Sequence, residues 1–363
     1  MGLQLGIVGL PNVGKSTLFN ALSAAGAEAA NYPFCTIEPN VGVVPVPDPR
    51  LQALAEVVNP QAILPTTVDF VDIAGLVRGA SKGEGLGNQF LGNIRSTDAI
   101  VHVVRCFEDP NIVHVEGGVD PLRDIEIIDT ELLLKDLDTV EKRYARVEKP
   151  AKVDVKLRAE AELLARLIAW MNSGKPARSF ELDEQEQPIF RSLFLLTAKP
   201  VLYACNVDEG SIPDGNAFSE RVKAHAAAEG SRAVVISAAI EAEIQTLPES
   251  ERPGFLQSLG LTESGLDRLI REGYSLLGLI TYFTAGEKEV RAWTIRRGTK
   301  APGAAGVIHT DFERGFIRAE VIKFKDYVAL KGESGARSAG KLGVEGKEYV
   351  VEDGDVMHFR FNV

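Results

Sequence analysis

Short apolar runs rich in β-branched residues recur along the first two thirds of the chain. They occupy residues 3–8, 67–73, 99–104, 200–205 and 232–236, and turn residues bound each run. Runs of this length without polar alternation are typical of strands buried in a parallel sheet. Because segments with a helical period lie between them, the pattern predicts an α/β fold with a doubly wound, mostly parallel sheet.

A long insertion separates the third and fourth of these runs. Two apolar stripes inside it advance by alternating steps of four and three residues, namely Leu133, Leu137, Val140, Tyr144 and Val147, and then Leu157, Ala161, Leu164, Ile168 and Met171. Such heptad spacing is typical of paired helices, and Pro150 lies between the stripes. We therefore expect an antiparallel helical hairpin whose tip is formed by residues 142–158.

The C-terminal part of the chain lacks long helical periodicity. Strand-like runs occur at residues 291–295, 315–324 and 356–361. They predict a small β-rich domain. The expected division is an α/β domain from residues 1–122 and 199–280, a helical insertion at 123–198 and a C-terminal domain at 281–363.

Composition narrows the class of protein. The chain has 363 residues, of which 45% are hydrophobic and 25% charged, as is usual for soluble domains. No apolar run approaches the roughly 20 residues that span a bilayer, and the N-terminus opens directly into a predicted strand. We expect a cytoplasmic protein with no membrane contact. Cys35, Cys106 and Cys205 are too widely spaced to indicate a disulfide framework or a zinc site.

Charge is distributed unevenly over a chain whose net charge is -11. Residues 142–158, at the tip of the predicted hairpin, contain seven basic and two acidic residues. A basic segment on an acidic body can mark a contact with nucleic acid, and a solvated helix face is the alternative that charge alone leaves open.

The residues directly after the first predicted strand carry the strongest chemical signal. Residues 9–17 read G-L-P-N-V-G-K-S-T and precede a helical run. Glycines let the backbone turn its amides toward phosphate oxygens, and the new helix adds the positive end of its dipole. The predicted phosphate-binding residues are Asn12, Val13, Gly14, Lys15, Ser16 and Thr17. Lys15 would contact the β and γ phosphates, and the Ser16 hydroxyl would bind Mg²⁺.

Two further segments fit a nucleotide switch. Asp72 and Gly75 belong to D-I-A-G at the end of the second predicted strand, where Asp72 would act on Mg²⁺ and the Gly75 amide would sense a γ phosphate. Thr36, in F-C-T-I-E-P-N, would complete the metal shell, although an ordinary loop hydroxyl is the alternative. The glycine-rich residues after Gly75 suit a segment that orders with ligand.

The base-recognition segment departs from the Asn-Lys-x-Asp pattern of switch GTPases. Here the corresponding residues are Asn206, Val207, Asp208 and Glu209. Glu209 is one methylene longer than the aspartate that accepts hydrogen bonds from guanine, so the guanine contact should be misplaced. Adenine can instead be recognised by backbone groups near Asn206 and Val207, and we expect ATP to be preferred over GTP. Ser237, after the next strand, would complete the base pocket.

The catalytic residues also depart from the common pattern. Leu76 follows Gly75, where many GTPases carry a glutamine that orients the attacking water, and slow intrinsic hydrolysis is expected. Lys15, Gly75 and His114 are the candidate catalytic residues. His102 is a second histidine candidate, although a lone histidine in such a run usually has a structural role. Asn12 is a candidate for holding a potassium ion near the phosphates.

Taken together, several motifs closely resemble the YchF proteins, the Obg-like ATPase subfamily of the Obg group. The resemblance rests on G-L-P-N-V-G-K-S-T, N-Y-P-F-C-T-I-E-P-N, D-I-A-G-L-V, N-V-D-E and the tail motifs T-Y-F-T-A-G-E-K-E-V-R-A-W-T-I and E-D-G-D-V-M-H-F-R-F-N-V. It covers essentially the whole chain. It implies a P-loop domain of the Obg type, an inserted coiled-coil arm and a C-terminal β-grasp module of the TGS type.

The resemblance also implies a function. The likeness to this family implies a Mg²⁺-dependent ATPase that uses its nucleotide state to control binding to a partner. The expected partner is the ribosome, in particular its large subunit, or another RNA-containing assembly, and the chain is expected to be a monomer. Residue by residue, it assigns phosphate contacts to 12–17, metal contacts to Ser16 and Thr36, and adenine to the Val207 backbone. Family members present a histidine that matches His114. Cys35 falls in the switch loop, where redox control is an alternative to a passive thiol.

Two other functions compete with this interpretation. The chain could be a GTPase of the wider Obg group in which Glu209 does recognise guanine. It could also be an RNA-binding assembly module with incidental hydrolysis. A metabolic kinase fits less well, because Thr36, Asp72 and Gly75 together indicate nucleotide switching and no acceptor pocket is evident.

Overall fold

The computed structural model describes residues 3–29, 40–73 and 87–362, and these form two compact units. Of the described residues, unit 1 contains 3–25, 40–42, 69–73 and 87–269, whereas unit 2 contains 26–29, 43–68 and 270–362. None of the helices in these ranges combines the length and apolar composition that a membrane span requires.

The main sheet has six strands, and the five apolar runs predicted from the sequence all lie in it. Its order is β2 (Val41–Pro45), β4 (Thr67–Asp72), β1 (Gln4–Val8), β5 (Ala99–Arg105), β6 (Val201–Asn206) and β7 (Arg232–Ile236). The pairs β4–β1, β1–β5, β5–β6 and β6–β7 are parallel. Every residue of β5 and β6 is buried, which explains why these strands show no polar alternation.

Helices complete the α/β core of unit 1. They are α1 (Lys15–Ala29, which continues into unit 2), α3 (Gly87–Ser96), α7 (Ala217–Ala228), α8 (Ala238–Thr246), α9 (Arg252–Ser258) and α10 (Gly265–Leu276, which also continues into unit 2). The predicted doubly wound fold is confirmed. Cys106 and Cys205 are buried within it, as expected of structural thiols.

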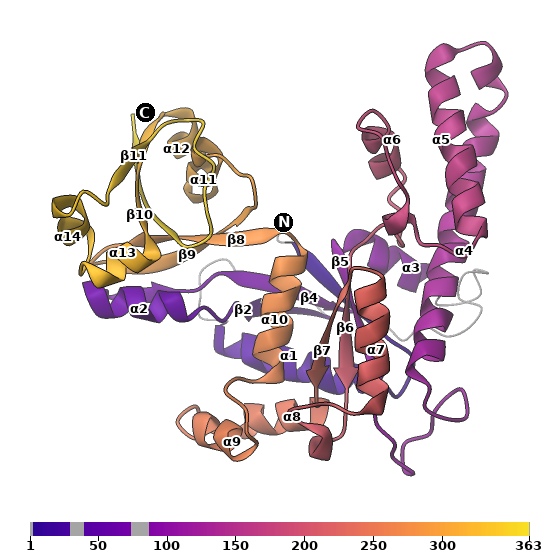
Figure 1. Cartoon of the computed structure of the whole chain (residues 1–363), viewed down its shortest axis with the longest axis horizontal. Helices are drawn as coiled ribbons and strands as arrows, with labels where there is room; N and C mark the ends of the chain where they lie inside the picture. The colour runs from indigo at the N-terminus through magenta and orange to yellow at the C-terminus, as the bar shows by residue number, and fades with distance from the viewer. Residues whose placement is uncertain (1–2, 30–39, 74–86, 363) are drawn as a thin grey trace. The chain divides into compact units, whose positions relative to one another are not determined.

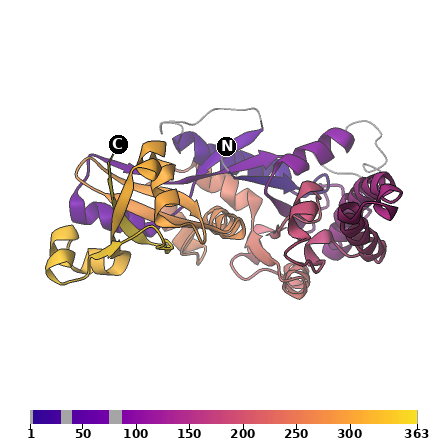
Figure 2. The same ribbon diagram turned by 90° about the horizontal axis from the view of Figure 1, so that it is seen from above.

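The insertion forms the predicted helical hairpin. Helix α4 (Pro121–Val147) leads through the short η2 helix (Pro150–Lys152) into α5 (Val155–Asn172), and α4 and α5 lie side by side (Figure 1, Figure 2). The heptad side chains pack between them around Val140, Leu164 and Leu167. The chain returns to β6 through η3 (Ala177–Ser179) and α6 (Gln187–Ser192).

A buried carboxylate fixes this return segment against α4. Asp136 accepts hydrogen bonds from the backbone N–H groups of Leu196 (2.8 Å) and Thr197 (2.7 Å) and from the Thr197 hydroxyl (2.7 Å). Burial raises the pKa of Asp136, and these three donors act in the opposite direction. The side chain therefore holds the last segment of the insertion at a defined point on α4.

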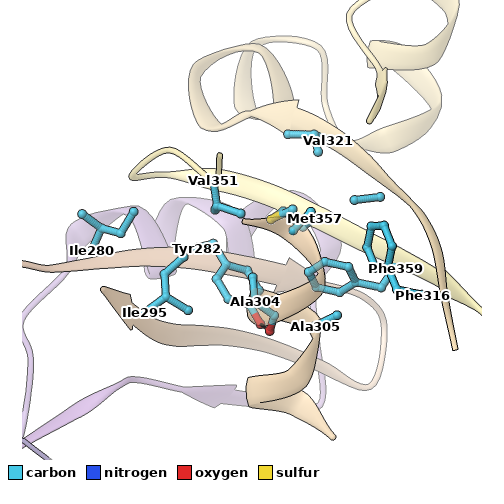
Figure 3. Packing of buried hydrophobic residues seen from close by; sticks show 12 residues of the cluster. Ile280, Tyr282, Ile295, Ala304, Ala305, Phe316, Val321, Val351, Met357 and Phe359 are labelled. Atoms are coloured by element: carbon cyan, nitrogen blue, oxygen red, sulfur yellow. Dashed lines mark hydrogen bonds between the residues drawn. The ribbon is translucent and has the colours of Figure 1, made fainter. Parts of the chain in front are cut away.

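Unit 2 contains a second six-stranded sheet. Its order is β11 (Gly343–Glu345), β10 (Phe316–Lys323), β12 (Asp355–Phe361), β8 (Leu279–Ala285), β9 (Glu289–Arg296) and β3 (Ala62–Leu64). Helices α11 (Ala301–Ile308) and α12 (Thr310–Arg314) pack against it, and Tyr282, Phe316 and Phe359 lie in the core shown in Figure 3. The predicted strands near 291–295, 315–324 and 356–361 are confirmed.

Residues 43–68 join this second unit, a feature that the sequence pattern did not indicate. Helix α2 (Pro49–Val58) packs with α13 (Phe324–Ala329) and β9, while a further helix, α14 (Glu333–Ser338), lies beyond α13. Arg50 of α2 donates to Asp48 and to Asp353 at 2.7 Å each, and its guanidinium lies over the ring of Phe283. The three-domain division predicted from the sequence remains a prediction.

A polar network joins the root of the arm to α7. Arg178 Nη2 donates to Glu229 Oε2 (2.8 Å), Tyr203 OH donates to the same oxygen (3.2 Å), and His225 Nε2 lies 3.1 Å from Glu229 Oε1. Burial acts to raise the pKa of Glu229, but the hydrogen bond from His225 and the charge and hydrogen bond of Arg178 outweigh it and lower this pKa to about 2.

This network predicts a pH-dependent stability difference for Glu229→Gln. Because the folded-state pKa is depressed, the stabilisation is present above the ordinary carboxyl pKa and is lost as pH falls toward about 2. We expect a loss of roughly 2 kcal/mol at pH 7, after allowing for solvent screening, and about half that at pH 3. The measurement is urea unfolding followed by tryptophan fluorescence. It is made in a Trp293→Phe background, where Trp170 in α5 is the remaining tryptophan, and it gives the loss in free energy of unfolding.

Glu348→Gln is the matched control, since Glu348 forms an exposed ion pair with Lys300. Its effect should stay within about 0.5 kcal/mol at both pH values. An equal loss in the Glu229 and Glu348 variants, or one that does not change with pH, would contradict the assignment.

Candidate functional site: a nucleotide cavity in unit 1

A cavity of about 1180 Å³ opens where the parallel strands of unit 1 end. Residues that follow β1, β5, β6 and β7 line it, together with Asp72, the last residue of β4. Ligands of open α/β sheets bind at this carboxyl edge, where neighbouring connections diverge. The cavity is therefore the candidate nucleotide site.

The P-loop has the backbone that its sequence predicted. Gly14 has a φ of +92° and Asn12 a φ of +64°, and α1 begins at Lys15. A Cβ atom on Gly14 would lie 2.2 Å from Nδ2 of Asn206. The glycine is thus required both by its left-handed conformation and by the close approach of the amide. The N-terminus of α1 faces a cradle suited to an anion.

Lys15 and Asp72 form an ion pair inside the cavity, and Ser16 also lines it. The hydroxyl of Ser16 and the carboxylate of Asp72 are oxygen donors of the kind that Mg²⁺ prefers. The residues present therefore fit this ion, which would neutralise phosphate charge when bound. Thr36, the third predicted metal residue, lies outside the described residues, as do Gly75, Leu76 and Cys35.

Asn206 connects the P-loop to the start of α8 across the cavity. Its Nδ2 donates to the Val13 carbonyl (2.9 Å), and its Oδ1 accepts from the Ala238 N–H (2.9 Å). Val207, only 2% exposed, donates its N–H to the Ile236 carbonyl (2.9 Å). The Ser237 hydroxyl is buried and has no hydrogen-bond partner within the described chain, so it is available to a bound ligand.

Arg105, which the sequence pattern did not single out, builds one wall of the cavity. Its fully buried guanidinium donates to the carbonyls of Phe107 (3.1 Å) and Ile112 (3.1 Å), and Phe107 and Ile112 both line the cavity. Burial lowers the pKa of Arg105. In the sequence, the only feature that could have drawn attention to Arg105 is its place as a basic residue at the end of an apolar strand.

The two histidine candidates lie in different surroundings. His114 Nε2 is 2.8 Å from Asp124 Oδ2, and its Nδ1 accepts from the Glu116 N–H (3.1 Å), so both ring nitrogens are engaged. His114 is not among the residues that line the cavity. His102 is buried in β5 beside Tyr203, and burial lowers its pKa to about 3. Its surroundings are those of a structural residue.

Most of the predicted nucleotide residues meet in the cavity. Those that line it are Asn12, Gly14, Lys15, Ser16, Thr17, Asp72, Asn206, Val207 and Ser237. Val13 is buried behind the loop, where its carbonyl accepts from Asn206. The Asn12 amide, predicted to hold potassium, donates to the Val113 carbonyl (3.1 Å). The roles of these residues remain predictions.

The chain is similar in sequence to known families and, over its whole length, to known proteins. Residues 4–135 match a family described as 50S ribosome-binding GTPase, and residues 279–362 match YchF-GTPase_C, described as a protein of unknown function. The chain is 59% identical to proteins named ribosome-binding ATPase YchF from Bacillus subtilis (strain 168) and Escherichia coli O157:H7, with 100% of each chain covered.

A solved structure is also similar. The structure titled as the Schizosaccharomyces pombe YchF GTPase is 42% identical, has a TM-score of 0.90, and is matched over 99% of this chain and 98% of that chain. At this identity and coverage the likeness extends through both units.

The geometry predicts that Gly14→Ala severely weakens nucleotide binding. The added methyl would collide with Asn206 and impose a left-handed conformation on alanine, which costs about 1–2 kcal/mol by itself. We expect nucleotide affinity to fall more than tenfold, as measured by calorimetry. Gly230→Ala is the matched control, because Gly230 has a φ of +71° but nothing within 4 Å of its Cβ position. It should lose stability without losing nucleotide affinity, and equal affinities in the two variants would rule out the collision.

Proposed function

Because this chain belongs to the YchF family, we propose that it is a Mg²⁺-dependent ATPase whose nucleotide state controls its binding to the ribosome. The cavity supports this proposal, since a P-loop, a lysine and two oxygen ligands for a metal meet at one edge of a parallel sheet. The names of its full-length relatives, which are ribosome-binding ATPases, support the choice of substrate and partner.

The proposed reaction is the hydrolysis of ATP by water to ADP and phosphate. The amides of the P-loop hold the phosphates, and Lys15 neutralises the negative charge that develops on the transferred group. In the structure the Lys15 ammonium forms an ion pair with Asp72. Nucleotide binding must therefore separate this ion pair, freeing the ammonium for phosphate and the carboxylate for the metal side.

The observation that carries the preference for ATP is the hydrogen bonding of Val207. Its N–H is engaged by Ile236, while its carbonyl accepts no hydrogen bond within the described part of the chain. A free acceptor suits the exocyclic amino group of adenine, whereas guanine presents a carbonyl oxygen at the same ring position. Asn206 is committed to Val13 and Ala238. These features favour adenine.

The alternative of an Obg-type GTPase rests on Glu209. This residue begins the short η4 helix (Glu209–Ser211) and also lines the cavity. The similar structure from S. pombe is titled a GTPase. The relative affinities for the two nucleotides decide between these candidates.

The proposal also includes roles for individual residues and general properties of the chain. His114 would assist hydrolysis, and a potassium ion near Asn12 would add positive charge at the phosphates. A Lys15-dependent cycle, a TGS-type C-terminal domain, a monomeric state and a cytoplasmic location complete the proposal.

Calorimetry with nucleotide-stripped protein and Mg²⁺ tests the choice of base. We expect tighter binding of ATP and its non-hydrolysable analogue than of the guanine nucleotides. The double substitution Val207→Lys, Glu209→Asp restores the guanine-type motif and should raise the affinity for GTP relative to ATP by about tenfold or more. Tighter GTP binding by the unmodified chain would move the proposal to an Obg-type GTPase.

Lys15→Ala separates a nucleotide-controlled switch from an RNA-binding module with incidental hydrolysis. Removing the ammonium should abolish hydrolysis and the effect of ATP on ribosome sedimentation, because the phosphate charge is no longer neutralised. Circular dichroism provides the folding control. If ribosome binding by the variant still responds to ATP as in the unmodified chain, nucleotide control through the P-loop is wrong.

A further inference from the structure

A basic groove lies along the arm of unit 1, apart from the nucleotide cavity. It has a volume of about 340 Å³ and is bounded by α4, by Arg95 in the last turn of α3, and by Ser192 and Leu193 at the end of α6. Its α4 side is lined by Lys135, Asp138, Thr139, Lys142, Arg143 and Arg146. Five cationic side chains and one carboxylate therefore line one small groove.

The cations of α4 follow a helical stripe. Lys135, Thr139, Lys142 and Arg146 are separated by steps of four, three and four residues, so they share one face. At 1.5 Å per residue this face spans roughly 16 Å. The heptad side chains that pack against α5 occupy other positions. The residues of the stripe therefore do not belong to the face of α4 that packs against α5.

Two of these cations have no counter-ion among the residues that the structure describes. Lys135 and Lys142 pair with Asp138 (3.9 and 2.7 Å), and Arg143 pairs with Glu160 of α5 (2.6 Å). Arg95 and Arg146 form no ion pair within the described residues. Positive charge held at two sides of a groove without local compensation attracts an anionic partner.

An exposed aromatic residue lies next to the groove. Phe194 directly follows Leu193, which lines the groove, and 68% of its surface is exposed. Its φ is +49°, in the left-handed region that a helix end ordinarily assigns to glycine or asparagine. A bulky side chain held there in solvent gains nothing from burial. Residues in such conformations are concentrated at ligand sites.

We propose that this groove binds a single-stranded segment of RNA. Arg95, Lys135 and Arg146 contact successive phosphates, and the ring of Phe194 stacks on an unpaired base. Cationic grooves combined with aromatic platforms are the usual means of holding single strands. The inference rests on the proposed function, since the ribosome offers such RNA, and it locates the contact in the groove rather than at the turn between α4 and α5.

The favoured partner follows from the combination of features. An acidic protein segment would use the cations but would have no use for an exposed ring in a strained conformation. A paired RNA helix would offer phosphates but no unstacked base. Only a single strand uses both the charges and the ring.

Fluorescence anisotropy with a labelled single-stranded oligoribonucleotide and the full chain tests the proposal. Arg95→Ala with Arg146→Ala should weaken binding and reduce the slope of log affinity against log salt by about 0.7 per lost phosphate contact. Phe194→Gly should lower affinity about fivefold or more with an unchanged slope, because stacking is not ionic. Glycine suits this backbone, so the variant should fold, and Phe194→Trp should restore binding.

Controls come from the turn between α4 and α5. Lys152→Ala removes an exposed charge and Val153→Ala an exposed apolar side chain (87% exposed), and neither residue lines the groove. Both variants should bind as the unmodified chain does. Unchanged affinity in the groove variants, or a loss at Lys152 equal to that at Arg146, would overturn the proposal. So would equal competition by polyglutamate, which would indicate an acidic protein partner.

Ribosome sedimentation with the same variants separates this inference from the proposed function. Loss of both RNA and ribosome binding in the groove variants supports the two together. If the unmodified chain binds the oligoribonucleotide through the groove but does not bind ribosomes, the groove assignment holds and the proposed partner is wrong.

Discussion

The nucleotide site depends on one buried amide. Asn206 donates to Val13 in the P-loop and accepts from Ala238 at the start of α8, so a single side chain fixes the P-loop relative to the turn that follows β7. Each backbone group left unpaired in such a site would cost about 1–3 kcal/mol. The same amide explains Gly14, because any Cβ there would occupy the space of Asn206 Nδ2. Gly14 and Asn206 are far apart in sequence, but the position of the Asn206 amide requires a glycine at residue 14.

The residues that could be predicted are those whose chemistry is tied to a local sequence pattern. The buried strands have apolar runs, the P-loop has fixed spacing, and the hairpin has heptad stripes, so each was visible in the sequence. The roles of Thr36 and Gly75 remain predictions, since these residues lie outside the described chain. His114 was visible as a candidate, but its engagement by Asp124 and Glu116 depends on the fold.

Other features could not be predicted because they arise from long-range packing. Strand β3 has only three residues and pairs with β9 more than two hundred positions away, and Arg50 reaches Asp353 across a similar separation. Arg105 acts on backbone carbonyls, which carry no sequence signature. The basic groove combines α3, α4 and α6, so its charges are scattered in the sequence and gather only when these helices pack.

Helix α4 connects the two candidate sites physically. Its first turn carries Asp124, which holds His114 next to Val113, and Val113 in turn accepts from Asn12 of the P-loop. Its later turns carry the cations of the groove. A continuous helix of 27 residues is about 40 Å long, so α4 alone spans the distance between Asp124 and the cations of the groove. A ligand that competes for the Asn12 amide would release Val113 and therefore act on the end of α4 that Asp124 anchors. If α4 takes two positions, nucleotide and RNA would be coupled through this helix without any contact between the two ligands.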